Sequence, residues 1–280
     1  MTVRVVTDSA CDLPQELVDE LRIEIVPLTI RFGAEEFVDR VELSADAFWD
    51  RLRSSHDLPE TAAPSAGAFE ACFRKLVDGG ANGIICINLS SRLSATMQAA
   101  QVAAGAVGND ACPITVIDSL TCSMGLGALC ITAGQRAAAG DSLDVIAAEV
   151  QDRVERTELY GTLDTLEFLK KGGRIGNARA LLGSMLSIKP VVEVRDGVVE
   201  EAGKVRTRSK ALRSIADKVR AQPIDSLAVL HGQATDLDEF LELIADVHPP
   251  GEVVVGVVGP VIGTHAGPGV LGVTFQVSRG

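Results

Sequence analysis

The sequence predicts an α/β protein of two domains with a ligand at their interface. Residues 1–155 are expected to form a parallel-sheet α/β/α domain, and residues 156–280 an α+β domain with a mixed sheet. Three observations support this prediction. At 280 residues, the chain is longer than one hydrophobic core usually fills. Apolar strands alternate with helices in the first half, as in parallel sheets covered on both faces. The second half mixes hairpin and helix signals.

The first half contains four strand-like segments, and helix-like segments follow them. Asp12 is expected to cap a first helix with Pro14 in its first turn, and Ser44 to cap a second. Phe69, Cys72, Phe73 and Leu76 recur at helical spacing in a third helix, which should stop at Gly79. The expected strands are 3–8, 23–32, 83–90 and 113–119, and the later helices are 91–107, 122–140 and 142–157.

The second half begins with a strand at 158–164 and a short helix that ends in a glycine pair. Residues 189–205 are typical of a hairpin that turns at Asp196–Gly197, since Asp-Gly favours the tight turn between two strands. A helix over 207–221, a strand over 226–232 and a helix over 236–247 follow. The last two strands are expected on either side of a loop at 259–269.

Composition excludes several classes of function. The chain has 26 basic and 38 acidic residues, a net charge of −12, which argues against a nucleic-acid-binding role. Its six cysteines form no CxxC pair, and neither a signal peptide nor an apolar run long enough to cross a membrane is present, so we expect a cytoplasmic protein with reduced cysteines. The four histidines are not spaced as metal ligands, and no nucleotide-binding fingerprint occurs, so no metal or cofactor is expected.

Hydroxyl-bearing residues follow three of the predicted parallel strands. They occur at 7–9, at 90–96 and at 118–119, and a fourth group lies in the turn TAAPS at 61–65. Loops at the carboxyl ends of parallel strands meet at one edge of a sheet, where α/β proteins bind ligands. Each residue alone fits an ordinary helix cap, but together they favour a hydroxyl-lined pocket.

Two further polar residues lie beside glycines. His265 is the one titratable side chain in GPVIGTHAGPG, and it is either a solvated turn residue or a contact for a ligand that the bare backbone can approach. Arg174 follows a glycine pair in KKGGRIG, where it is either a surface residue or a donor aimed at an anion.

Six segments in order resemble the DegV family, which includes the fatty-acid-binding subunits of bacterial fatty acid kinase. These are TDSACDLP, TAAPS, NLSSRLSAT, VIDS, FLKKGGRI and GPVIGTHAGPG, and they span the whole chain. The resemblance implies a two-domain carrier, not an enzyme, that buries one long-chain fatty acid. It also implies that the carrier presents the carboxylate to a separate kinase subunit, which forms the acyl-phosphate.

The resemblance assigns the lipid-binding residues. The carboxylate would meet Thr61 and a serine of SSRLSAT, with Ser94 preferred over Ser91, while His265 and Arg174 would complete the polar network. The chain departs from the family at Ala62 and Ala63, where serine and glutamine are usual, at Ala95 in place of glycine, and at Ala266 in place of threonine. These changes leave the residues of the expected contacts in place. They put in doubt which length of fatty acid is preferred and which partner protein is used, more than they put lipid binding in doubt.

Other functions remain open. The runner-up is an enzyme that acts on a small carboxylated or phosphorylated metabolite at the sheet edge, including a hydrolase built from Ser94, His265 and Asp8, although no G-x-S-x-G motif is present. A third possibility is a regulatory module for another ligand. Since a fatty acid is exchanged with membranes, transient membrane contact is also expected through a cationic patch, with a solvated helix face as the alternative. The residues of that patch are Arg206, Arg208, Lys210 and Arg213.

Overall fold

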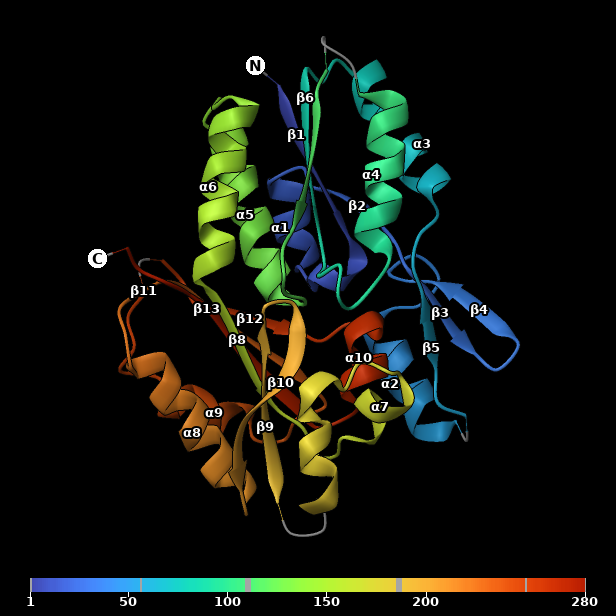
Figure 1. The fold of residues 1–280 in the computed structure, drawn as a ribbon. Coiled ribbons are helices and arrows are strands. Elements are labelled where there is room, and N and C mark those ends of the chain that lie inside the picture. The colour runs from blue at the N-terminus through green and yellow to red at the C-terminus, as the bar shows by residue number, and fades with distance from the viewer. Residues whose placement is uncertain (1, 56, 109–111, 185–187, 250, 280) are drawn as a thin grey trace.

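The computed structural model describes residues 2–55, 57–108, 112–184, 188–249 and 251–279. It confirms the predicted fold class: a parallel sheet with helices on both faces lies above a mixed sheet in Figure 1. The chain passes from the upper layers to the lower sheet at Thr157, where the last helix of the first half leads directly into a strand.

The upper sheet has four parallel strands in the order β2-β1-β6-β7. Helices α3 and α4 pack on one face and α5 and α6 on the other (Figure 1). Every residue of β6 is buried, as expected for a strand covered on both sides. The elements are β1 (Val3–Asp8), α1 (Gln15–Glu20), β2 (Glu24–Val26), α3 (Ala66–Asp78), β6 (Gly83–Asn88), α4 (Thr96–Val107), β7 (Ile114–Asp118), α5 (Met124–Ala138) and α6 (Leu143–Arg156).

The predicted helix cap at Ser44 is confirmed, and the predicted cap at Asp12 is not. The Ser44 hydroxyl accepts a hydrogen bond from Ala47 N, 3.2 Å away, at the start of α2 (Ala45–Ser54). Helix α1 instead begins after Pro14, which makes no side-chain cap. Asp12 has left-handed backbone angles, with φ of 51°, and its carboxylate bonds to distant segments, so the prediction that it caps α1 was wrong.

The segment 23–32 forms two strands in two different sheets, where one strand was expected. Pro27 has no amide hydrogen to donate, and Leu28 N donates to the Ser9 hydroxyl, so the parallel pairing stops at Val26. The chain continues in β3 (Thr29–Phe32), which pairs with β4 (Glu35–Val38) and β5 (Glu60–Ala62) in a small antiparallel sheet. That sheet contacts a helix of the C-terminal half.

The lower sheet has six strands in the order β10-β9-β8-β13-β11-β12, and only β11 and β12 pair in parallel. Asp196 and Gly197 have φ of 48° and 80°, which confirms the predicted hairpin turn. Helices α8 and α9 cover one face, and the other face points toward the upper sheet. The elements are β8 (Thr157–Thr162), α7 (Glu167–Lys171), β9 (Lys189–Arg195), β10 (Val198–Val205), α8 (Arg208–Arg220), β11 (Ile224–Gly232), α9 (Leu237–Leu243), β12 (Val254–Val257) and β13 (Val270–Val277).

The Gly/Pro-rich segment between β12 and β13 was expected to be a loop and contains a helix, α10 (Pro260–Ala266). Pro260 occupies its first turn, where the fixed φ of proline favours helix entry. Gly267, with φ of 76°, follows its end. Two 3-10 helices, η1 (Ser9–Cys11) and η2 (Gly176–Ser184), complete the described part of the fold. Within the described ranges, no helix is long and apolar enough to cross a membrane.

Candidate functional site

A pocket lies between the parallel-sheet half and the face of the six-stranded sheet that α8 and α9 leave uncovered. Its cavity volume is about 120 Å³, within about 970 Å³ of space between protein atoms that is partly open to solvent. Among the residues described, no cluster of histidine, cysteine, aspartate and glutamate is suited to a metal ion.

One wall of the pocket is the six-stranded sheet. Alternate residues of each strand face it, namely Leu159 and Gly161 on β8, Val192 and Val194 on β9, and Gly272 on β13. Gly161 and Gly272 pair directly across the two strands. Because neither residue has a side chain, the sheet leaves free space above this pair.

The opposite wall comes from loops and helix ends of both halves. It includes the turn after β6, the start of α5 and one side of α10. Most lining residues are aliphatic: Leu28, Leu89, Leu93, Leu159, Leu163, Leu169, Val192, Val194, Val199, Leu230, Val258, Val261, Ile262 and Val270. Such a lining is suited to an aliphatic chain and offers few partners to a polar metabolite.

Four of the five predicted site residues line this pocket. They are Thr61 on β5, Ser94 before α4, Arg174 after α7 and His265 on α10. The Thr61 hydroxyl lies 2.9 Å from His265 Nε2, although the two residues are 204 positions apart in the chain. Ser91, the second-choice serine, is exposed and lies outside the lining, where its amide donates to Asp118.

His265 is held in an apolar environment. Burial, and secondly the nearby Arg174 charge, lower the pKa of its imidazole to about 4, so the ring is neutral near pH 7. Nε2 contacts Thr61, while Nδ1 is buried without a partner beside Gly172. A Cβ at Gly172 would lie 2.2 Å from Nδ1, so the first glycine of KKGGRIG is required for the ring to occupy this position.

Arg174 supplies a positive charge at the polar end of the pocket. Its guanidinium donates to two backbone carbonyls, Leu93 O at 3.0 Å and Gly172 O at 2.7 Å. No carboxylate pairs with it in the part of the chain that the structure describes. The side chain is therefore fixed in direction while its charge remains uncompensated, an arrangement that favours an anion.

Ser94 lies at the entrance to α4. Its hydroxyl is 2.9 Å from Thr96 Oγ1 and accepts a hydrogen bond from Thr96 N. The helix begins at Thr96, later than the expected 91–107, because residues 90–94 form a turn closed by Ser94 N donating to Ser90 O. The half-buried hydroxyl lies at the pocket surface.

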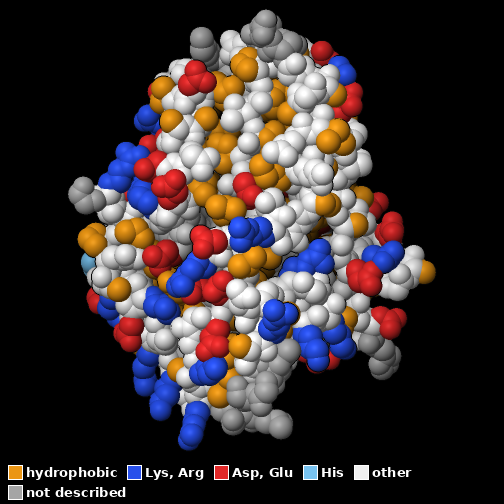
Figure 2. Space-filling view, viewed as in Figure 1, with side chains coloured by type: hydrophobic (Ala, Val, Ile, Leu, Met, Phe, Trp, Pro, Cys, Tyr) orange, Lys and Arg blue, Asp and Glu red, His pale blue; other side chains and the backbone are white. Residues whose placement is uncertain are grey.

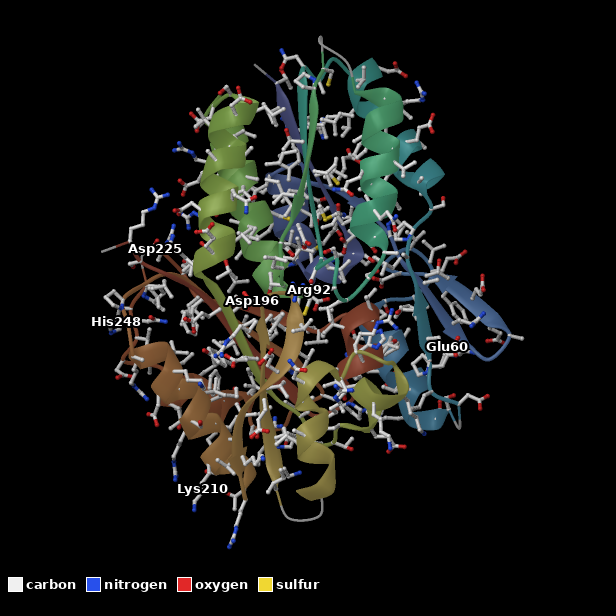
Figure 3. All side chains as sticks on the ribbon, in the orientation of Figure 1. Glu60, Arg92, Asp196, Lys210, Asp225 and His248 are labelled. Carbon is white, nitrogen blue, oxygen red and sulfur yellow. The ribbon has the colours of Figure 1, made fainter. Side chains whose placement is uncertain are left out.

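Asp8 and Ser90, two other polar residues of the predicted loops, have structural roles. Asp8 accepts from Ala10 N, Asn88 Nδ2 and Leu89 N, and none of its described hydrogen bonds reaches His265 or Ser94, so the hydrolase triad is not assembled. Ser90 donates to Gly197 O and so joins the turn after β6 to the β9–β10 hairpin. Figure 3 shows this junction, with Arg92 beside the Asp196 turn.

The glycines around His265 serve close packing, whereas the sequence suggested that they clear space for a ligand. A Cβ at Gly263 would lie 2.6 Å from the Phe48 ring, and one at Gly267 would lie 2.4 Å from the Phe168 ring. Bare backbone therefore lets α10 press against α2 and α7, with His265 on the side that faces the pocket.

A second depression lies on the outer side of the polar residues. Its cavity volume is about 360 Å³, and Thr61, Arg174 and His265 line both it and the inner pocket. Glu60 and Lys171 also line it, and Figure 3 labels Glu60. The polar end of the pocket is therefore close to the protein surface.

Sequence reasoning missed several lining residues. Ser123 has φ of 53° and Cys122 precedes it at the start of α5, and no motif marked either as a pocket residue. Gly161 and Gly272 could not be paired before the register of β8 and β13 was known.

Comparison with known proteins identifies the family. A DegV domain-containing protein of Streptomyces coelicolor is 35% identical over 98% of both chains. A solved fatty-acid-binding DegV family protein of Thermus thermophilus is 31% identical, covers 99% of this chain and 100% of its own, and superposes with a TM-score of 0.92. A stearic-acid-binding protein of Eubacterium ventriosum is 25% identical over 98% of both chains, with a TM-score of 0.88. The family model described as "Uncharacterised protein, DegV family" matches residues 2–278, and the chain belongs to the DegV family.

Proposed function

We propose that this protein binds one long-chain fatty acid, with its tail in the aliphatic pocket and its carboxylate among Thr61, Ser94, Arg174 and His265. The observation that carries the proposal is the uncompensated Arg174 charge at one end of a pocket whose lining is mostly aliphatic. The fatty-acid-binding relatives of the same fold support it.

The energetics agree with this ligand. Burying one methylene contributes about 0.8 kcal/mol, so a tail of about 15 methylenes contributes about 12 kcal/mol. Association costs about 4–15 kcal/mol in lost motion. The tail therefore supplies most of the affinity, and the polar residues orient the headgroup and offset the cost of removing a carboxylate from water.

Single hydroxyl deletions test the headgroup assignment. Thr61→Ala and Ser94→Ala should each lower the amount of fatty acid that copurifies, measured by denaturing extraction and mass spectrometry. The free energy of unfolding of the lipid-free protein should change by less than about 1 kcal/mol, because each hydroxyl is half-buried. Ser91→Ala is the matched control, since Ser91 lies outside the pocket lining. Wild-type lipid content in both variants would place the headgroup elsewhere.

The protein is further proposed to be a carrier that presents the carboxylate to a kinase, without catalysing a reaction itself. The support is geometric: Thr61, Arg174 and His265 line both the inner pocket and the outer depression. A carboxylate held by these residues would lie directly behind the outer depression, from which a phosphoryl donor would approach.

Paired assays test this presentation. His265→Ala and Arg174→Ala should reduce acyl-phosphate formation with a fatty acid kinase subunit and ATP more than they reduce bound lipid, because the tail still holds the acid. For Arg174, the loss of a charge-assisted contact should cost about tenfold or more in product formation. If acyl-phosphate formation and bound lipid fall by the same factor, these residues act in lipid binding alone. Acyl-phosphate formed from ATP without a kinase would overturn the carrier role.

Exchange of the acid is proposed to involve transient contact with an anionic membrane through α8 and the residues before it. The exposed side chains of Arg206, Lys210 and Arg213 have no carboxylate partner among the described residues. Lysine and arginine side chains gather over α8 in Figure 2, and Lys210 points away from the body of the protein in Figure 3. Arg208 is excluded from this patch, because it pairs with Asp236 at 2.7 Å.

Charge reversal tests the patch. Lys210→Glu should slow fatty acid transfer from vesicles rich in anionic lipid and leave transfer from neutral vesicles unchanged, and added salt should reduce the difference. Arg22→Glu is the matched control, since Arg22 is an exposed cation on the other half with no described ion pair. Equal transfer rates for both variants and for the wild type would reject membrane contact at this patch.

A further inference from the structure

We propose that Asp12 is a positioning residue that holds α10, and with it His265, against the parallel-sheet half of the protein. The side chain acts at a distance from the pocket, through the backbone at the start of α10. Its effect on the headgroup rests on the proposed lipid-binding function, whereas its effect on α10 does not.

The Asp12 carboxylate joins three segments that are far apart in sequence. It accepts a hydrogen bond of 2.6 Å from the Ser123 hydroxyl at the start of α5 and one of 3.0 Å from the backbone amide of Gly259 at the start of α10. Asp12 itself follows η1, and 5% of its surface is exposed. This set of contacts is called the Asp12 clasp below.

Helix α10 depends on this carboxylate at its N-terminus. Its N-cap residue is Gly259, which has no side chain with which to accept a hydrogen bond, and Pro260 has no amide to donate. The Gly259 amide is therefore satisfied from across the domain boundary. A Cβ at Gly259 would lie 2.8 Å from Asp12 Oδ1, so glycine is required for this close contact.

The clasp fixes two parts of the pocket wall together. Ser123 lines the pocket directly. On α10, Val261, Ile262 and His265 line it within two turns of Gly259. Seven residues are too few for a helix to be stable alone, so its position is set by its contacts at either end and along its length. Displacement of the Gly259 end would move His265 relative to Thr61.

The surroundings of Asp12 disfavour a charged carboxylate, so the residue lowers stability unless its hydrogen bonds compensate. Burial raises its pKa to about 7, the bonds from Ser123 and Gly259 lower it, and Asp39 and Arg40 act in opposite directions. A buried carboxyl that only filled space would be replaced at a gain in stability by an apolar side chain. Its two hydrogen bonds instead join two parts of the pocket wall, through Ser123 and Gly259.

Hydrogen exchange of the lipid-free protein tests the clasp without reference to lipid. In Asp12→Ala, protection of the α10 amides that Gly263 and Gly267 donate to Gly259 O and Gly263 O should fall about tenfold or more. Asp12→Asn should restore protection to within about threefold, because its amide oxygen can accept from Gly259 N and its amide nitrogen can donate to Ser123 Oγ. Asp8→Ala is the matched control, since Asp8 is a buried carboxyl whose described hydrogen bonds all lie within the first half.

A second variant breaks the clasp from its other side. Gly259→Ala should push the carboxylate away and reproduce the loss seen in Asp12→Ala, since φ of −78° at Gly259 permits alanine. This variant decides the matter if Asp12→Ala does not fold. Wild-type protection of α10 in either clasp variant, or an equal loss in Asp8→Ala, would overturn the proposal.

The headgroup provides a readout that general destabilisation would not move. With stearic acid labelled with carbon-13 at the carboxyl, the carboxyl resonance should shift in Asp12→Ala and Gly259→Ala, and should keep its wild-type position in Asp12→Asn and Asp8→Ala. An unchanged resonance together with lost α10 protection would show that α10 does not position the headgroup. If the wild-type protein takes up no labelled acid, the proposed function fails, and hydrogen exchange still decides the clasp.

Discussion

Filling the space above the Gly161–Gly272 pair should shorten the acid that the protein accepts. Gly161 lies in β8 with its missing side chain directed into the pocket. A Cβ there would meet only Leu271 O at 3.5 Å and Gly272 Cα at 3.9 Å, both ordinary contacts. A Cβ at this position therefore fits the folded chain, and Gly161→Val should direct three carbon atoms into the proposed tail site.

The expected loss of affinity follows from the number of methylenes of the fatty acid that valine displaces. If valine excludes about three methylenes of a long tail, at about 0.8 kcal/mol each, binding weakens by about 2.4 kcal/mol, or about 50-fold. Acids shorter by about three methylenes should lose much less. The lipid-free protein should be as stable as the wild type or more stable, because valine favours strands over glycine.

Competition binding with acids of graded length measures this change. Gly203→Val is the matched control, because it adds the same side chain to the same sheet, beside Val191 on the face away from the pocket. Undiminished affinity of Gly161→Val for stearic acid would show that the tail does not cross the glycine pair, and the proposed orientation of the ligand would be wrong.

Three more predictions follow from described contacts. In Gly172→Ala, the added Cβ would lie 2.2 Å from His265 Nδ1, so the imidazole should be displaced and less lipid should be recovered on extraction. The urea unfolding midpoint should change little, because φ of −72° at Gly172 permits alanine. Wild-type lipid content would contradict this prediction. Trp49→Phe removes the indole donor to Val258 O, 3.0 Å away, and should lower the free energy of unfolding by about 1–3 kcal/mol, whereas an unchanged urea midpoint would show that the bond contributes nothing. Burial raises the folded-state pKa of Asp8 from 3.8 to about 6, so the folded state holds this proton more tightly than the unfolded state does. The resulting contribution to the free energy of unfolding is about 3 kcal/mol. It is fully present below about pH 4 and is lost as the pH rises through about 6. Urea unfolding should show a smaller loss of stability between about pH 4 and pH 7 in Asp8→Asn than in the wild type, and identical pH slopes would refute this.

Local rules were sufficient for much of the fold. The buried run of β6, the Ser44 cap and the Asp196–Gly197 turn each depend on residues within a few positions of one another, and the sequence alone predicts them. The same local reasoning missed α10 and placed Asp12 at the wrong helix. A short Gly/Pro-rich helix has little intrinsic stability, so packing against α2 and α7 decides whether it forms.

The sequence by itself determined the α/β class, the order of most strands and helices, and the residue types that a carboxylate-binding pocket would need. Only the tertiary structure decided which of those residues meet. Thr61 contacts His265 across 204 positions, Gly161 faces Gly272 through the register of two strands, and Asp12 reaches Gly259 from the other half of the chain. The physical reason is that a pocket is a space left by long-range packing, and neither its volume nor its lining is encoded in any local pattern of the chain.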